Sequence, residues 1–147
     1  MEARDTAAVL SIQSACPEIA QWTLRDYSRA AEGEMAGWVA ESEDAAGSSV
    51  SGFIVARRVA SDLEVLNFAV APAQRRCGVG AALLNAALAW GSTFAAEKAF
   101  LEVRVSNLAA IRFYERHGFE VTGRRPRYYT APIEDALVLA ASCVAAT

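Results

Sequence analysis

The chain has 147 residues, of which 54% are hydrophobic and 21% are charged, and its formal net charge is −3. This composition excludes a disordered chain, and the negative balance gives no electrostatic case for nucleic-acid binding. The length favours a single domain over residues 1–147. No apolar run reaches the ~18 residues of a membrane span, and the first residues lack the apolar stretch of a signal peptide. We therefore expect a cytoplasmic protein without membrane contact.

The cysteines are few and far apart in the sequence. Cys16, Cys77 and Cys143 are odd in number and form no CxxC pair, which argues against a disulfide framework or a zinc site. His117 is the single histidine, which excludes a histidine-rich metal site. We expect no bound metal.

The first third of the chain predicts two helices. Residues 6–15 place Val9 and Ile12 on one helical face, with Asp5 as the N-cap. Residues 23–31 form the second helix, with Thr23 as its cap and Gly33 just beyond its end.

The rest of the chain predicts strands interleaved with two further helices. Residues 37–41 and 52–59 are strands, and they form a hairpin if the serine-, glycine- and acid-rich loop 42–51 joins them. The remaining strands are 64–70, 99–105, 120–127 and 133–141, and the remaining helices are 78–95 and 107–117, the second of which is closed by Gly118. This order predicts a mixed α/β domain with one central sheet flanked by helices, and no linker or second domain.

A glycine-containing loop lies between the strand 64–70 and the longest helix. Its sequence is Arg75-Arg76-Cys77-Gly78-Val79-Gly80. Alternate glycines let the backbone approach a ligand closely, and the helix N-terminus adds partial positive charge, so a pyrophosphate fits. A tight turn at a helix start is the alternative. A Walker loop and a Rossmann fingerprint are excluded, because Ala81 and Leu83 stand where they need lysine and glycine.

Two segments resemble the motifs of the GNAT acetyltransferase superfamily. Arg75, Gly78 and Gly80 match its motif A, R/Q-x-x-G-x-G/A, and residues 101–119 resemble motif B, which ends in a tyrosine and then Gly-Phe. The resemblance extends from about residue 5 to residue 142. It is closest to the RimI-type ribosomal-protein-alanine N-acetyltransferases, on residues 66–70, 101–104, Asn107, 124–129 and 134–136.

The resemblance implies a GNAT fold and the transfer of acetyl from acetyl-CoA to a protein N-terminal α-amine, such as that of a ribosomal protein, by direct attack in a ternary complex. The residues that it assigns to the cofactor are Phe68, Ala69, Val70, Arg75, Arg76, Cys77, Gly78, Val79, Gly80, Ala81, Asn107 and Tyr114. Two features depart from the family. The first strand is missing or short, and the tryptophan of an aromatic-Pro-Trp stretch is displaced to Trp22, in a region that helps shape the acceptor side.

Glu102 is the expected general base. It shares one strand face with Phe100 and Arg104, and a carboxylate within an apolar run is unusual. The alternative is an ion pair, either with Arg104 or with a cation of a neighbouring strand. The family resemblance favours a base or a water-positioning residue.

Tyr114 is the expected acid. Tyr114 lies two helical turns after Asn107, where an aromatic residue more often belongs to the core. The resemblance, however, places the Tyr114 hydroxyl at the sulfur of coenzyme A. A phenol of pKa ~10 protonates a thiolate at some energetic cost, so hydrogen bonding to the sulfur is an equal description. Asn107 is expected to be a helix N-cap as well as a cofactor contact.

The segment 124–129 is either a solvated strand end or, by the resemblance, part of the acceptor site, with Arg125, Arg127 and Tyr128 binding the substrate. Other functions stay open. One alternative is an acetyltransferase that acts on lysine side chains or a small amine. Another is a module that binds acyl-CoA without catalysis. A scaffold that binds no coenzyme A is the remaining alternative. Cys77 is expected to be dispensable, because direct attack needs no enzyme nucleophile.

Overall fold

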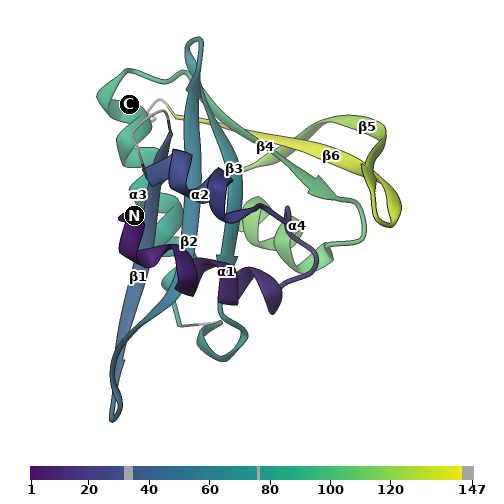
Figure 1. The fold of residues 1–147 in the computed structure, drawn as a ribbon. Helices are drawn as coiled ribbons and strands as arrows, with labels where there is room; N and C mark the ends of the chain where they lie inside the picture. Colours follow the sequence, from purple (N-terminus) through teal and green to yellow (C-terminus); the bar gives the residue numbers. More distant parts are fainter. Residues whose placement is uncertain (32–34, 76, 144–147) are drawn as a thin grey trace. The chain divides into compact units, whose positions relative to one another are not determined.

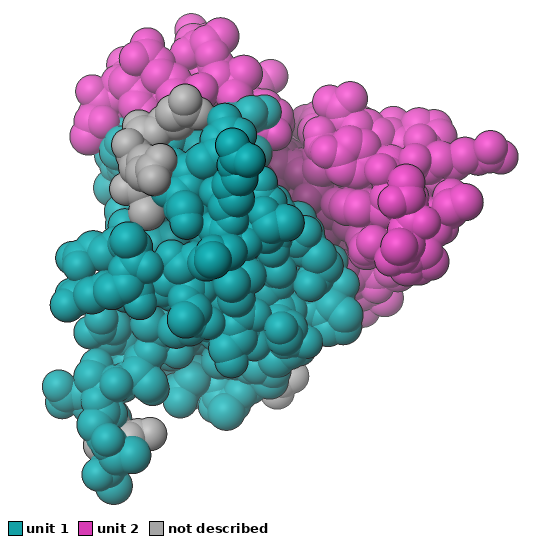
Figure 2. All heavy atoms as spheres, in the orientation of Figure 1, with its two compact units in different colours: residues 1–57, 66–90 teal, residues 58–65, 91–147 magenta. Residues whose placement is uncertain are grey.

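The computed structural model describes residues 1–31, 35–75 and 77–143, and these fall into two compact units (Figure 2). Unit 1 contains residues 1–57 and 66–90, and unit 2 contains residues 58–65 and the chain from residue 91. The strands form a mixed six-stranded sheet in the order β1-β2-β3-β4-β6-β5. Their bounds are β1 Ala36–Asp44, β2 Gly47–Val59, β3 Asp62–Val70, β4 Lys98–Arg104, β5 Glu120–Thr130 and β6 Ile133–Ser142. Flanking helices and a mixed central sheet confirm the predicted fold class.

Unit 1 packs helices on its strands. Helices α1 (Thr6–Ser14) and α2 (Leu24–Ala31) lie across its strands in Figure 1. Val9, Ile12 and Tyr27 of these helices pack with Phe53 and Val55 of β2 in one buried cluster. The alternation of side chains along a strand explains why every second residue of β2 joins this cluster.

Helix α3 (Val79–Thr93) covers the other face of the same strands. A Cβ added to Gly52 would lie 3.0 Å from Leu83 Cδ1 and 3.2 Å from Val79 Cγ1, so the helix packs closely on the strand at that point. Trp38 of β1, paired with Ile54 of β2, meets Trp90 of α3 with ring centroids 5.8 Å apart. The longest apolar helix is therefore a core element as well as the end of the glycine loop.

The predicted loop 42–51 is wrong. β1 continues to Asp44, β2 begins at Gly47, and these two residues pair across a tight turn. Gly47 has φ +114°, a conformation that favours glycine. Glu43, Ser48 and Ser49, which suggested a loop, are exposed residues of a two-stranded ribbon, where polar side chains face solvent without cost. Ser51 is buried, and its hydroxyl donates to the Ala40 carbonyl at 3.1 Å. The hairpin itself is confirmed.

Unit 2 contains the parallel pairing of the sheet. Leu63 and Glu64 of β3 pair with Ala99 and Phe100 of β4, whereas β4 and β5 are both antiparallel to β6. Helix α4 (Leu108–Arg116) contributes the buried Ile111 and Tyr114. Gly118 follows α4 with φ +88°, which confirms the glycine end of this helix.

The N-terminal predictions need one correction. Thr23 caps α2 through reciprocal bonds with Asp26, as expected, but the Asp5 side chain makes no capping bond to α1. Its Oδ2 instead accepts the N–H of Glu2 at 2.7 Å, across a short 3-10 helix, η1 (Ala3–Asp5). Among the described residues, no strand precedes α1. Gly33 lies outside the described residues.

In the part of the chain that the structure describes, no helix is long and apolar enough to span a membrane. A cytoplasmic location stays a prediction. Cys16 is buried, Cys77 is exposed, Cys143 is partly buried, and all three are free thiols.

Candidate active site

The glycine loop leads into α3 within unit 1. Gly78 has φ +79°, and a Cβ at this position would meet nothing within 4 Å, so the backbone is open to a ligand on that side. The first N–H groups of α3, at Val79, Gly80 and Ala81, have no acceptor within their own helix. A phosphate group fits these donors and the positive end of the helix dipole. Arg76 lies outside the described residues.

The Arg75 side chain turns back onto unit 1. Its Nε donates to the Val70 carbonyl at 3.3 Å, and its Nη2 lies 3.2 Å from Cys16 Sγ and 3.3 Å from Glu18 Oε1. These contacts tie the start of the loop to the end of β3 and to the segment after α1. Arg75 thus anchors the loop, a role that the motif alone did not suggest.

The end of β3 carries the residues expected to offer backbone groups to the cofactor. Two of those groups already have partners. The N–H of Phe68 donates to Asn67 Oδ1 at 3.1 Å, and the Val70 carbonyl accepts from Arg75. Ala69 is buried in the core of unit 1.

A buried polar network beside this strand was missed by sequence analysis. Asn67 Nδ2 donates to the Ala20 carbonyl at 3.0 Å and to the Tyr27 hydroxyl at 2.9 Å. The Tyr27 hydroxyl donates to Gln13 Oε1, and Gln13 also holds both backbone groups of Trp22, at 2.9 and 3.0 Å. The network fastens the irregular segment between α1 and α2 to β3. Sequence spacing gives no signal for such long-range polar contacts.

Glu102 lies on β4 in unit 2, on the sheet face opposite the buried Leu101 and Val103. Its side chain is 14% exposed, and its Oε1 lies 2.9 Å from Nε of Arg125. The Tyr128 hydroxyl donates to the same carboxylate, which raises the pKa of Tyr128 to about 12. The structure thus brings together three residues expected in the site, and Glu102 pairs with a cation two strands away.

The alternative ion pair between Glu102 and Arg104 does not form. Arg104 instead pairs with Glu134 at 3.1 Å and stacks over the Tyr129 ring, 4.2 Å from its centroid. Glu134 Oε2 also accepts the Ser106 N–H at 3.0 Å, which connects the start of β6 to the segment before α4. Side chains two residues apart on a strand share a face, but cross-strand partners are closer.

Tyr114 is buried among aromatic rings. Phe113 and Phe119 lie at ring-centroid distances of 5.4 Å each. Burial, together with the nearby Tyr129, raises the pKa of Tyr114 well above its usual value. A raised pKa favours the protonated hydroxyl, the form that can donate a hydrogen bond. Asn107 caps α4 as predicted, because its Oδ1 accepts the Ala110 N–H at 3.3 Å.

Residues 124–129 form an irregular part of β5. The pairing with β6 shifts between Arg125 and Tyr129, and Arg127 has φ +53°. Asp135 holds this bulge: its Oδ1 accepts the Arg127 N–H at 2.9 Å, and its Oδ2 lies 2.7 Å from Nε of Arg124. Because of the bulge, two consecutive tyrosines reach the face that carries Glu102 and Arg104.

The chain matches the model of the acetyltransferase (GNAT) family over residues 6–119, and it belongs to that family. Enzymes of this family transfer acetyl groups, and they use acetyl-CoA as the donor. The match spans residues of both units. The matched range includes the glycine loop, Glu102 and Tyr114.

Two proteins with partial matches to this chain are named as N-acetyltransferases. The chain is 44% identical over 78 residues to the N-alpha-acetyltransferase of Sulfurisphaera tokodaii, covering 52% of this chain and 46% of the relative. It is 36% identical over 93 residues to the [ribosomal protein bS18]-alanine N-acetyltransferase of Escherichia coli, covering 62% of this chain and 63% of the relative. The matches thus span about half to two-thirds of these proteins.

Solved structures agree with this. The crystal structure of the Escherichia coli ribosomal-protein-S18-alanine N-acetyltransferase has a TM-score of 0.81 at 26% identity, covering 100% of this chain and 93% of that one. Ard1 from Thermoplasma volcanium has the same TM-score at 29% identity, covering 99% of this chain and 95% of that one. The resemblance to the ribosomal-protein-alanine N-acetyltransferases is confirmed.

Proposed function

We propose that the chain transfers the acetyl group of acetyl-CoA to the α-amine at a protein N-terminus, with a ribosomal protein as the first acceptor to test. The names of the similar proteins support this choice. The observation that carries it is the largely buried Glu102 carboxylate, which pairs with Arg125 and accepts a hydrogen bond from Tyr128. We also propose that both units form one domain and serve one reaction.

The donor side of the proposal rests on unit 1. The open backbone at Gly78 and the N–H groups that begin α3 would hold the pyrophosphate, and Arg75 would keep the loop in place. The donor supplies an acetyl group already activated as a thioester. The protein then has to bind, orient and manage protons, and it needs no nucleophile of its own.

Glu102 would accept the proton of the acceptor ammonium, directly or through one water molecule. A terminal α-amine has a pKa of ~7.7–8.0 and a lysine side chain ~10.4, so deprotonation near neutral pH costs roughly 3–4 kcal/mol less for the α-amine. A single carboxylate is therefore sufficient for an α-amine. Tyr114 would donate a hydrogen bond to the leaving sulfur while keeping its own proton.

Mass spectrometry of intact peptides tests this function. Three acceptors are incubated with acetyl-CoA and the protein: the N-terminal peptide of bS18, an Nα-blocked peptide with one lysine, and a small polyamine. We expect one added acetyl group on the first and little on the others. Preferred acetylation of the lysine peptide or the polyamine would contradict the proposal.

A further inference from the structure

The arginine at the β5 bulge is held in a backbone conformation that arginine rarely adopts. Arg127 has φ +53°, a region that glycine and asparagine enter more readily than arginine. The Asp135 carboxylate holds this conformation by accepting the Arg127 N–H at 2.9 Å. The bulge explains the backbone, because it turns Tyr128 and Tyr129 towards Glu102 and Arg104. It does not explain why the side chain is arginine, because asparagine would suit the backbone better.

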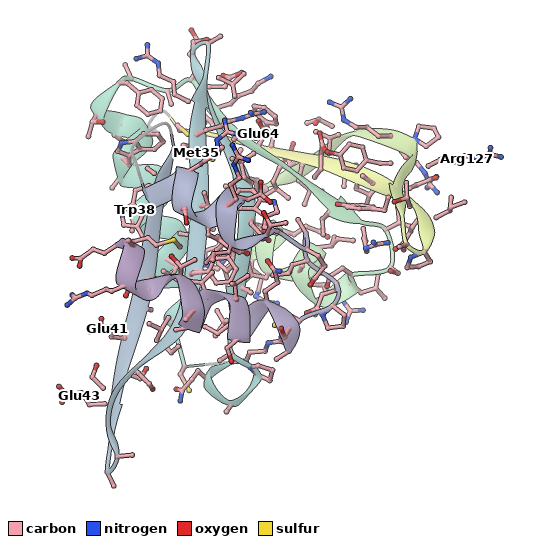
Figure 3. The ribbon with its side chains drawn as sticks, in the orientation of Figure 1. Met35, Trp38, Glu41, Glu43, Glu64 and Arg127 are labelled. Atoms are coloured by element: carbon pink, nitrogen blue, oxygen red, sulfur yellow. The ribbon has the colours of Figure 1, made fainter. Side chains whose placement is uncertain are left out.

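The charges around the bulge differ in what they contact. Arg124 pairs with Asp135 at 2.7 Å and Arg125 pairs with Glu102 at 2.9 Å. Within the described residues, no ion pair involves the exposed Arg127 guanidinium. Its charge is the smallest of the causes that lower the pKa of Asp135. Figure 3 shows the Arg127 side chain extending away from the β5–β6 ribbon. A strained backbone that presents a charged side chain is a reason to look for a ligand.

We propose that Arg127 selects acceptors that carry an aspartate or glutamate within about the first five residues, an inference that rests on the proposed function. Arg127 directly precedes Tyr128, which contacts the expected base Glu102. An extended acceptor advances ~3.3 Å per residue, so an acceptor whose amine lies at Glu102 and whose chain follows β5 reaches the bulge within a few residues. The guanidinium fork binds a carboxylate through two parallel hydrogen bonds, which a neutral side chain cannot form.

The test compares peptides of one background, Ala followed by glycines, with a single aspartate, asparagine or lysine at each of positions 2 to 6. For the wild type, we expect kcat/KM to be roughly three- to tenfold higher with aspartate than with asparagine at one or two adjacent positions, mainly through KM. The preference should shrink in 0.5 M salt, because the site is exposed.

Two variants and a control separate selection from folding. Arg127→Asn suits the backbone and removes the charge, so it should abolish the preference for aspartate over asparagine. Arg127→Glu should reverse it in favour of lysine, a gain that damage to the fold cannot produce. Arg112→Asn, an exposed arginine of α4, is the matched control and should keep the preference.

Binding of the same peptides, measured by calorimetry with coenzyme A present, distinguishes this inference from the proposed function. If peptides bind with the aspartate preference but none is acetylated, the proposed function fails and the inference stands. Acetylation without any aspartate preference, or a preference that survives in Arg127→Asn, overturns the inference and leaves the function intact. The absence of any peptide binding overturns both.

Discussion

Glu102 shows how neighbours define one residue's chemistry. Its carboxylate accepts from Arg125 and Tyr128, and both partners come from the irregular part of β5. The same contacts supply hydrogen-bond donors to the carboxylate when no substrate is bound. Glu102 can therefore be both an ion-pair partner and a catalytic base. They differ in what happens when the carboxylate alone is removed.

Replacement of Glu102 by glutamine tests the base. The amide keeps the shape but accepts no proton, so we expect kcat to fall by ~10²–10⁴-fold near pH 7, with a smaller loss above pH ~8, where an α-amine is already neutral. Stopped-time acetylation assays across pH measure this, and calorimetry should show an unchanged affinity for coenzyme A. Glu120→Gln, an exposed glutamate of β5, is the control. A loss that is equal at every pH would point to a structural ion pair.

The loop and α3 act as one element. The positive φ of Gly78 opens the backbone, and α3 directs its first N–H groups to the same place. The loop is anchored through Arg75, which contacts Glu18, Cys16 and Val70. A change within the loop should therefore affect donor binding before it affects the fold.

Gly80→Val tests this element. A β-branched side chain at the second residue of α3 would stand between the backbone and a phosphate, so we expect the Kd for coenzyme A to rise at least about tenfold. Calorimetry measures the affinity, and circular dichroism checks the fold. Cys77→Ala in the same loop is the control and should keep both donor binding and turnover. A folded Gly80→Val protein with wild-type affinity would remove the loop from the donor site.

The segment between α1 and α2 depends on buried hydrogen bonds for its position. The Tyr27 hydroxyl lies between Gln13 and Asn67, and burial raises its pKa well above the usual value for tyrosine. Tyr27→Phe leaves a buried Asn67 donor without this acceptor, although its bond to Ala20 remains. We expect the free energy of unfolding to fall by about 1–3 kcal/mol, as measured by urea denaturation. Ser28→Ala, on the exposed side of the same helix, should change it little, and equal effects would contradict the network.

At the scale of the whole molecule, displaced pKa values predict how stability depends on pH. Hydrogen bonds lower the pKa of Asp26, Glu134 and Asp135, so these groups stabilise the fold above pH ~4, and the effect is lost as pH falls. The pKa is raised for Tyr27 and Tyr114, and to about 12 for Tyr128 and Tyr129. Their contribution is present below pH ~10 and is lost as pH rises towards 12.

We therefore expect a plateau of stability between about pH 5 and pH 9, with losses on both sides. Urea midpoints at pH 3, 7, 9 and 11 measure the profile. Tyr114→Phe should make the alkaline loss shallower, because it removes one of the buried hydroxyls. A midpoint at pH 11 equal to that at pH 9 would contradict the predicted alkaline loss.

The sequence alone determined the features that depend on local spacing. Apolar patterns together with cap and turn residues predicted every helix and strand described here except the 3-10 helices. Thr23, Asn107 and Gly118 marked helix ends because caps bond within a few residues. The glycine loop and the motif around Glu102 and Tyr114 indicated the family. Polarity misplaced the turn of the first hairpin, because a two-stranded ribbon with solvent-facing side chains has the composition of a loop.

Only the tertiary structure decided which residues meet. The partner of Glu102 is Arg125 and not Arg104. This pairing arises because β6 lies between β4 and β5 in the sheet, and because the bulge held by Asp135 sets the register of β5 on β6. The contacts of Asn67 with Ala20 and Tyr27 join residues 47 and 40 positions apart. Such contacts depend on how elements pack, and no local pattern encodes them. The exposed charge of Arg127 also depends on packing. The structure alone shows that Arg124 and Arg125 are ion-paired while the Arg127 guanidinium is exposed.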